Sequence, residues 1–511
     1  MAASARLVPL SALDRAFLWL DRRTQPFHVA YLSLLTPPAG AGPDFVGQLA
    51  ERLRNAGAPT APFNRRLVRH RGVLTWLEDD EFDPEQHLVH LTLPRPGRPE
   101  QLVALAARLH GVHLDRAFPL WRMYLIGGLA DGRVGLYCKV HHALADGMAA
   151  TRLWLQSMSP EPLADLPPPW APPAEPRKAH APAPSVARRL VAAARSVPVV
   201  WDQLQVTARE IGEGDEAATT GHDAPATIFN QRVSSSRQLA VRSFALSRVR
   251  NIGRALGSTT NDVVLALCGA ALRGFLLEVR ALPDTSLIAM VPMSVREPGD
   301  RGAGNRIVPL LVRLGTDIPD PLYRLRTIRR SAEREKARCR GLSMGEIYAY
   351  LLATTGVPSL RLLLHPSSGR LPFNVVISNI NGASGPMYWQ GCKLDTLYPM
   401  SVVVDGLALN ITFASRGDSL DFGVVACRRS LPQMSRLLDH LEHALAELET
   451  LIPQPESVPL GDGLHEIRVP RRHKRAVHKR RAQVRAPIDT AAAAPAANDA
   501  KTPAQADRPA V

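Results

Sequence analysis

The chain has 511 residues, of which 45% are hydrophobic and 21% are charged, and these values are typical of a globular protein with two domains and additional segments. Its five cysteines are scattered and form no Cys-x-x-Cys pair, which argues against a disulfide framework or a structural zinc site. Charged residues interrupt the N-terminal apolar stretch, and no uncharged apolar run reaches the roughly 18 residues of a membrane span. We therefore expect a cytoplasmic protein without a signal peptide.

The first predicted domain covers residues 1–158 and mixes helices with strands. Ser11 is a typical helix N-cap, and Ala16, Phe17 and Leu20 follow it at helical spacing. The apolar pattern further predicts strands over residues 28–35, 121–127 and 134–140 and helices over residues 101–110 and 146–158. This mixture predicts an α/β layered domain.

A linker is predicted over residues 159–226. It has five prolines between positions 167 and 173, and this composition favours extended polyproline conformations over packing. A helix is expected within the linker over residues 186–211, followed by a polar stretch to residue 226.

A second α/β domain is predicted over residues 227–457, with a tail after it. The predicted helices cover residues 262–277 and 432–451, and the predicted strands cover residues 287–291, 373–378, 401–404, 407–413 and 420–425. In the tail, residues 458–511, positions 468–485 contain nine Lys or Arg residues and no acidic residue, which accounts for much of the net charge of +15. An Ala/Pro-rich end follows, and we expect the tail to be disordered.

One motif concentrates reactive side chains: residues 141–147 read His-His-Ala-Leu-Ala-Asp-Gly, where a predicted strand ends and a helix begins. Histidine titrates near neutral pH, so His142 is a candidate general base that takes a proton from an attacking alcohol. His141 would point away from His142 in a strand, and we expect it to support the loop. Asp146 could orient the imidazole or hold the loop through an arginine partner, and we favour the second role. Gly147 permits a tight turn or a close backbone approach.

Other interpretations of this motif must be weighed. A single histidine is most often a hydrogen-bonded structural residue, but the complete seven-residue pattern is much more specific than one side chain. His and Asp at this spacing could also share a metal ion. No third ligand is evident nearby, so we expect no metal.

The motif resembles the active-site signature of bacterial wax ester synthase/diacylglycerol acyltransferases, within the CoA-dependent acyltransferase superfamily. Further blocks that are similar to this family are residues 10–14, Pro119-Leu120-Trp121, Asn261-Asp262 and residues 291–296. Asp421-Phe422-Gly423 resembles a structural motif of the wider superfamily. The resemblance covers residues 8–455. It departs after Ser378-Asn379, where the family's Pro-Gly-Pro turn is absent, and this puts the local turn and the pocket shape in doubt.

The resemblance implies two chloramphenicol-acetyltransferase-like domains with a central substrate channel. It also implies an O-acyltransferase that moves a long-chain fatty acyl group from acyl-CoA to diacylglycerol, giving triacylglycerol, or to a long-chain alcohol, giving a wax ester. His142 would be the base, and acyl-CoA would be a co-substrate, with no other cofactor. Pro119, Leu120 and Trp121 would bind substrate, with core packing as the alternative. Asn261 and Asp262 would do so as well, with helix capping as the alternative.

Three alternatives remain open at this point. Condensation domains of peptide synthetases share the histidine motif but use carrier-protein thioesters and amine acceptors. A non-catalytic lipid-surface protein would also account for the basic tail, whereas nucleic-acid binding would rest on charge alone. For the acyltransferase itself, we expect the tail to make peripheral contact with the inner face of the membrane or with lipid inclusions.

Overall fold

The computed structural model describes residues 6–78, 82–145, 147–162, 166–171, 224–294, 307–340, 372–452, 456–460 and 464–468, with isolated positions between 198 and 209 and between 342 and 353. The chain divides into two compact units, Met1–Ile452 and Pro453–Val511. Most of the helix predicted over residues 186–211 lies outside the described residues.

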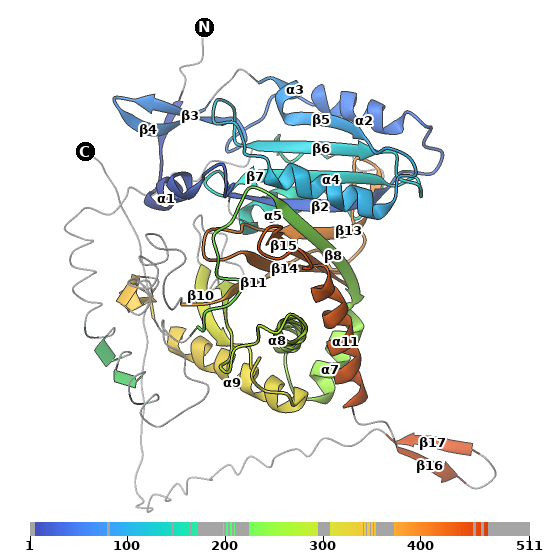
Figure 1. The fold of residues 1–511 in the computed structure, drawn as a ribbon. Coiled ribbons are helices and arrows are strands. Elements are labelled where there is room, and N and C mark those ends of the chain that lie inside the picture. Colours follow the sequence, from blue (N-terminus) through green and yellow to red (C-terminus); the bar gives the residue numbers. More distant parts are fainter. Residues whose placement is uncertain are drawn as a thin grey trace, which may run out of the picture. The chain divides into compact units, whose positions relative to one another are not determined.

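The first large sheet has six strands in the order β12-β13-β2-β7-β6-β5 (Figure 1). Their bounds are β12 (Tyr388–Trp389), β13 (Cys392–Met400), β2 (His28–Thr36), β7 (Val134–His141), β6 (Trp121–Gly127) and β5 (Leu88–Thr92). Three predicted strands, over residues 28–35, 121–127 and 134–140, agree with β2, β6 and β7 to within one residue at each end. Strands β12 and β13 come from the C-terminal half of the chain, so this sheet combines distant segments.

The predicted strand over residues 401–404 is wrong. The strand β13 ends at Met400, and Val404 instead forms a two-residue bridge with Leu407. Gly406 lies between them with φ +85°, a left-handed conformation that glycine adopts without strain. The three valines at positions 402–404 produce a strand-like pattern in the sequence, although the chain turns back at this point.

The second large sheet has the order β10-β9-β11-β14-β15-β8. Its strands are β8 (Arg237–Ala245), β9 (Ile288–Ser294), β10 (Ile307–Arg313), β11 (Val375–Asn381), β14 (Leu409–Arg416) and β15 (Ser419–Cys427). Four helices accompany it (Figure 1): α7 (Leu246–Ala255), α8 (Thr260–Glu278), α9 (Pro321–Cys339) and α11 (Arg436–Thr450). Both helices predicted for this half of the chain are present. The prediction over residues 262–277 corresponds to α8, and the prediction over residues 432–451 corresponds to α11.

Helix α8 is the one described helix that is long and apolar enough to cross a membrane. Of the most apolar 18-residue window of this helix, 67% is buried inside the protein. It packs against α9 and α11 and contributes Val263, Leu267 and Leu272 to the largest hydrophobic core. A buried core helix has this composition without spanning a membrane.

The two large sheets meet where β15 passes β13. A Cβ atom at Gly423 on β15 would collide with the Pro399 carbonyl on β13, so only glycine permits this approach. Nearby, the fully buried Asp421 accepts hydrogen bonds from the Leu397 N–H (2.9 Å) and the Ser243 hydroxyl (2.6 Å). The Asp-Phe-Gly sequence therefore joins the sheets and has a structural role.

A smaller sheet, β1-β4-β3, and several helices complete the first unit. Their bounds are β1 (Arg6–Pro9), β3 (Arg65–His70), β4 (Val73–Glu78), α1 (Ala12–Leu20), α2 (Phe45–Arg54), α3 (Pro84–His87), α4 (Pro99–Gly111) and α5 (Gly147–Gln156). Ser11 caps α1 through a reciprocal capping box with Asp14, as the sequence predicts.

The second unit contains a hairpin of β16 (Glu456–Leu460) and β17 (Leu464–Arg468), where the sequence predicts disorder from residue 458. Residues 469–511 lie outside the described residues.

Candidate active site

The histidine motif lies at the end of the central strand β7, and the backbone fixes its position. The His141 N–H donates to the Leu120 carbonyl (2.9 Å), and the His142 N–H donates to the Phe27 carbonyl (3.0 Å). The His141 carbonyl then accepts from the N–H groups of Leu144 and Ala145, which turns the chain toward α5. Both neighbouring strands therefore hold the pair of histidines.

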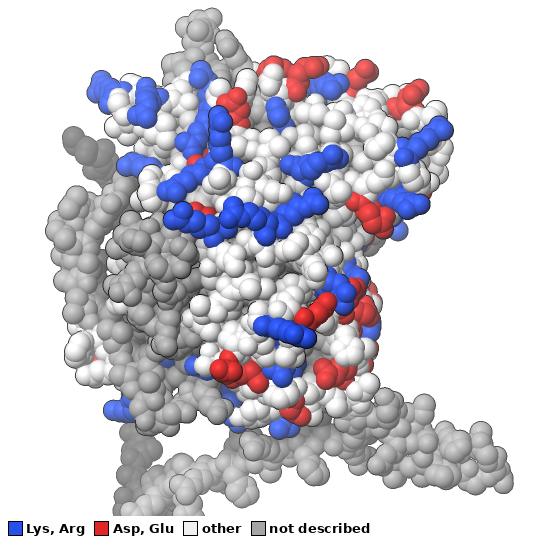
Figure 2. Space-filling model, viewed as in Figure 1, with Lys and Arg blue, Asp and Glu red and all other residues white. Residues whose placement is uncertain are grey.

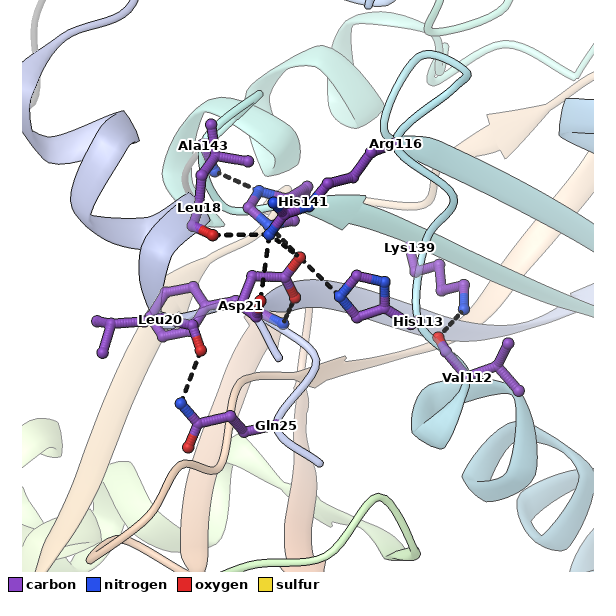
Figure 3. A network of polar contacts seen from close by, with 11 residues as sticks. Leu18, Leu20, Asp21, Gln25, Val112, His113, Arg116, Lys139, His141 and Ala143 are labelled. Atoms are coloured by element: carbon purple, nitrogen blue, oxygen red, sulfur yellow. Dashed lines mark hydrogen bonds and ion pairs between the residues drawn. The ribbon is translucent and has the colours of Figure 1, made fainter. Parts of the chain in front are cut away.

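A buried carboxylate, Asp21, gathers polar groups around His141 (Figure 3). Its Oδ2 lies 2.7 Å from His113 Nε2, 3.1 Å from an Arg116 guanidinium nitrogen and 3.4 Å from His141 Nε2. Its Oδ1 accepts a hydrogen bond from the Phe27 N–H at 2.9 Å. Asp21 thus contacts both the Phe27 backbone, which holds His142, and the side chain of His141.

The hydrogen bonds set the charge and tautomer in this network. Burial raises the pKa of Asp21, but hydrogen bonds from His113, His141 and the Phe27 N–H outweigh it and hold the pKa well below its usual range. The carboxylate is therefore ionised at neutral pH. His141 Nδ1 accepts from the Ala143 N–H (3.0 Å), which assigns the proton of the neutral ring to Nε2, the atom nearest Asp21.

His142 has different surroundings from its neighbour. Its half-buried ring lies 4.6 Å from the Phe17 ring and 5.8 Å from the Phe27 ring, measured between centroids. The two phenylalanine rings also stack on each other at 5.0 Å. One histidine thus faces an ionised carboxylate, and the other lies against aromatic side chains at the accessible side of the turn.

The sequence predicts roles for two further motif residues. Asp146 lies outside the described residues. At Gly147, the first residue of α5, an added Cβ would meet no atom within 4 Å, and φ does not lie in the left-handed region. The expected steric need for glycine is therefore wrong, because the chain already turns at residues 141–145. The Gly147 carbonyl accepts hydrogen bonds from Tyr31 (2.9 Å) and Thr151 (2.6 Å).

An apolar pocket, open on one side, lies between this sheet and α5, and its interior and mouth together hold about 470 Å³ of space outside protein atoms. Its lining includes Val29, Tyr31, Phe63, Trp121, Met123, Val140, Ala150, Trp154 and Trp170. Val29 and Val140 are paired across β2 and β7, directly beside the pair His28 and His141. The pocket thus approaches the strand ends that carry the histidine motif.

The Pro-Leu-Trp block divides between packing and the pocket. Trp121 lines the pocket, donates through Nε1 to the Phe63 carbonyl (2.8 Å) and stacks on Trp170 at 5.4 Å. Pro119 and Leu120 are buried and do not line the pocket. Leu120 contributes instead the backbone carbonyl that holds His141.

The Asn-Asp block lies at the start of α8, in the helix layer of the second sheet. Thr259 is the N-cap of α8, and its N–H donates to Asp262 Oδ2 at 3.0 Å while its hydroxyl accepts from the Asp262 N–H at 3.2 Å. This capping box gives Asp262 a structural role. Asn261 is half-buried in the first turn of the helix.

Sequence reasoning missed Asp21, His113 and Arg116. In the sequence, Asp21 is one of the charged residues that interrupt the N-terminal apolar stretch. Its position directly after an apolar helix and before Pro26-Phe27-His28 is the one local signal, because a buried carboxylate requires partners. Within the described residues, no group of three or more His, Cys, Asp or Glu side chains is arranged to hold a metal ion.

The fold is shared with solved acyl-transfer and condensation proteins. The first condensation domain of the calcium-dependent antibiotic synthetase matches with a TM-score of 0.54 at 15% identity, covering 88% of this chain and 97% of that one. At this identity the likeness concerns the fold alone. The two large sheets, which meet at β13 and β15, are the architecture that the chain shares with that domain.

Sequence comparison is more specific. Residues 10–264 match the wax ester synthase/diacylglycerol acyltransferase catalytic domain, and residues 303–449 match the C-terminal domain of the same family. The O-acyltransferase WSD of Acinetobacter baylyi is 40% identical over 460 residues, which cover 88% of this chain and 99% of that protein. The solved wax ester synthase/diacylglycerol acyltransferase of Marinobacter aquaeolei VT8 is 36% identical, with a TM-score of 0.69 over 87% of this chain and all of that one.

The chain therefore belongs to the wax ester synthase/diacylglycerol acyltransferase family. This confirms the family, the α/β fold class and the O-acyltransferase activity predicted from the sequence. The condensation-domain alternative loses support, since the likeness to those domains is much weaker.

Proposed function

We propose that this enzyme transfers a long-chain acyl group from acyl-CoA to diacylglycerol or to a long-chain alcohol, with His142 as the general base. The observation that carries the proposal is the unequal environment of the two histidines. His141 is held by Asp21, whereas the half-buried ring of His142 lies against Phe17 and Phe27. An imidazole at a strand end, packed against aromatic rings and close to an apolar pocket, suits proton transfer next to an alkyl chain.

The reaction follows from elementary chemistry. A neutral alcohol is a weak nucleophile, so His142 takes its proton as the oxygen attacks the thioester carbonyl, and the new C–O bond forms without an acyl-enzyme. The C=O bond of the tetrahedral intermediate then re-forms, the C–S bond breaks, and the CoA thiolate takes the proton from His142. Proton transfer of this kind contributes about 10²–10⁴-fold to the rate.

The pocket beside β2 and β7 is suited to an alkyl chain. Its lining is dominated by aliphatic and aromatic side chains, including Val29, Val140 and Trp121, and most of the surface that it offers a ligand is apolar, although Arg122 and Lys139 also contribute to the lining. We assign Trp121 to the wall of a chain-binding pocket. Leu120 and Pro119 support it from the core, and Asp262 acts at a distance by stabilising α8.

Incubation of the purified protein with palmitoyl-CoA and either hexadecanol or diacylglycerol tests this function. Lipid extraction and product analysis should show wax ester, triacylglycerol or both, together with one CoA thiol released per ester bond. Ester formation with neither acceptor, but amide formation from a carrier-protein thioester, would favour condensation chemistry. No product from any donor would favour a non-catalytic lipid-surface protein.

Peripheral attachment to a lipid surface completes the proposal. Diacylglycerol and long-chain alcohols are insoluble, so the enzyme must meet them at the inner face of the membrane or at lipid inclusions. The basic residues from Arg468 to Arg485 offer nine positive charges to anionic lipid, each worth about 1 kcal/mol close to the surface.

A further inference from the structure

Helix α1 presents an unusual surface, because two of its large apolar side chains, Leu13 and Trp19, are exposed. Leu13 is 51% exposed and Trp19 is 58% exposed, whereas Leu18 is the one residue of the helix that is fully buried. A helix that only packed on the core would bury its large apolar residues and expose charges. The outward face of α1 is therefore suited to an apolar environment outside the protein.

The neighbouring small sheet repeats this arrangement. Its inner face packs Trp76 into the core, while Leu7 is 40% exposed and Val73 is 54% exposed. Leu7 pairs with Leu77, which shares a face of β4 with Val73, so both exposed side chains lie on the outer face of the sheet. Strand β1 runs into α1 after only Leu10 and Ser11, which places the two apolar faces next to each other along the chain.

Basic side chains accompany these apolar groups. Figure 2 shows Lys and Arg side chains over β3, β4 and α1 at the left of the view. The exposed arginines of these elements and of the turn after α1 include Arg15, Arg22, Arg23, Arg69 and Arg71. The two described acidic residues of β1, α1, β3 and β4 are engaged, since Asp14 caps α1 and Glu78 pairs with Arg65 at 3.0 Å.

From these observations we propose that the outward face of α1 and the outer face of the β1-β4-β3 sheet dock on an anionic lipid surface. Exposed aliphatic and tryptophan side chains enter the boundary between headgroups and acyl chains, and the surrounding arginines contact lipid phosphates. Arg22, which lies 5.4 Å above the Trp19 ring, brings a cation and an aromatic group to the same point.

The location of α1 links docking to catalysis. Phe17, on the inner side of the same helix, lies 4.6 Å from the ring of His142, so one helix separates the catalytic histidine from the docked lipid. This inference rests on the proposed function, because it gives insoluble acceptors a short path from the lipid to His142. It differs from the basic tail, which would attract the enzyme to the membrane without orienting it.

Vesicle binding tests the docking surface without any substrate. The full chain is added to vesicles of phosphatidylcholine containing phosphatidylglycerol, at raised salt, where screening weakens attraction by the tail. The double variant Leu13→Ser/Trp19→Ser should bind at least about tenfold more weakly, because each large apolar side chain contributes on the order of one such factor. The matched control Leu277→Ser/Tyr323→Ser changes two side chains exposed to 51% and 44% on other helices and should bind like the unmodified chain.

The outcomes separate this inference from the proposed function. If both variants melt at the temperature of the unmodified chain, both are folded. Activity on detergent-dispersed substrate should persist in both variants. If the Leu13→Ser/Trp19→Ser chain binds vesicles as tightly as the unmodified chain, the docking surface is refuted, whatever the enzyme's activity. If the variant instead abolishes self-association measured by light scattering and leaves vesicle binding unchanged, the surface contacts a second copy of the chain and the lipid assignment is overturned.

Discussion

Two adjacent histidines have different surroundings because β7 ends at His141, whereas His142 begins the turn toward α5. His141 faces the ionised Asp21, and Ala143 fixes its tautomer through a backbone hydrogen bond. His142 faces Phe17 and Phe27 instead. This difference agrees with the proposal that His141 supports the turn and that His142 transfers the proton.

Asp21→Asn should weaken both the fold and the catalytic turn. The substitution keeps the shape of the side chain but leaves His113, His141 and Arg116 beside a neutral group, and breaking a buried ion pair from one side costs about 3–5 kcal/mol. Because Arg116 can turn to solvent, we expect the loss in free energy of unfolding to be close to the lower end of this range. A displaced motif should lower kcat by about 10²-fold. Thermal melting and steady-state kinetics measure the two effects.

His113→Gln is the matched control for Asp21→Asn, because it removes a partner of Asp21 and leaves His141 in place. It should lower stability with a much smaller effect on kcat. A wild-type kcat and melting temperature in Asp21→Asn would show that Asp21 does not support the motif.

The sequence could predict the motif but not its support. Adjacent residues specify the His-His pattern, and chemistry alone indicates a base. Asp21, in contrast, is 120 positions from His141 in the chain, and only the fold brings the two together. A single sequence carries no mark that distinguishes such a carboxylate from an ordinary charge near a helix end.

At the scale of elements, strands with local signals were predictable and strands with distant partners were not. Strand β6 is a nearly continuous apolar run that ends at Gly127, and its predicted bounds, residues 121–127, agree with the structure. Strand β13 was missed, because Lys393, Asp395 and Pro399 interrupt its pattern and its partner β2 lies more than 350 residues away. Pairing across that distance, and not propensity, holds β13 in place.

Gly423→Ala should separate the sheets at their joint. A methyl group at position 423 would enter the backbone of β13 at Pro399, and overpacking of this kind costs about 1–3 kcal/mol or more. Chemical denaturation should show the loss as a lower midpoint. Gly385→Ala is the matched control, since an added Cβ there meets no atom within 4 Å. Equal stability of the two variants would contradict the close approach of β15 and β13.

The contact between α4 and the sheets predicts a pH dependence of stability. Burial, together with the nearby charges of Arg237 and Lys139, lowers the pKa of His110 to about 3. His110 contacts the Tyr137 hydroxyl (2.8 Å) from this neutral state. Between pH 6.5 and about 3 the unfolded chain binds a proton that the folded protein does not, so the free energy of unfolding falls as pH falls below 6.5.

His110 alone should therefore remove about 2 kcal/mol of stability between pH 6.5 and pH 5. Denaturation at several pH values measures this slope. His110→Gln should make the slope shallower, whereas His70→Gln, at an exposed position, should leave it unchanged. An identical slope in the His110 variant would mean that this ring does not remain neutral in the folded protein.

At the scale of the whole molecule, the basic tail should act as a reversible electrostatic tether. Removal of residues 469–511 keeps the β16–β17 hairpin and deletes ten Lys or Arg residues, eight of them between positions 469 and 485. Binding of the full chain to anionic vesicles should fall steeply with salt, and the truncated chain should bind more weakly at low salt. Activity on detergent-dispersed substrate should survive truncation. Equal binding by both chains at low salt would refute the tether.

The most direct test of the central claim compares the unmodified enzyme with His142→Ala, using palmitoyl-CoA and hexadecanol or diacylglycerol. Ester formation and CoA release are measured together, and the melting temperature establishes that the variant is folded. If His142 transfers the proton of the attacking alcohol, the variant melts like the unmodified enzyme and forms ester about 10²–10⁴-fold more slowly. A folded His142→Ala enzyme that retains most of the ester-forming rate would contradict the assignment of His142 as the general base.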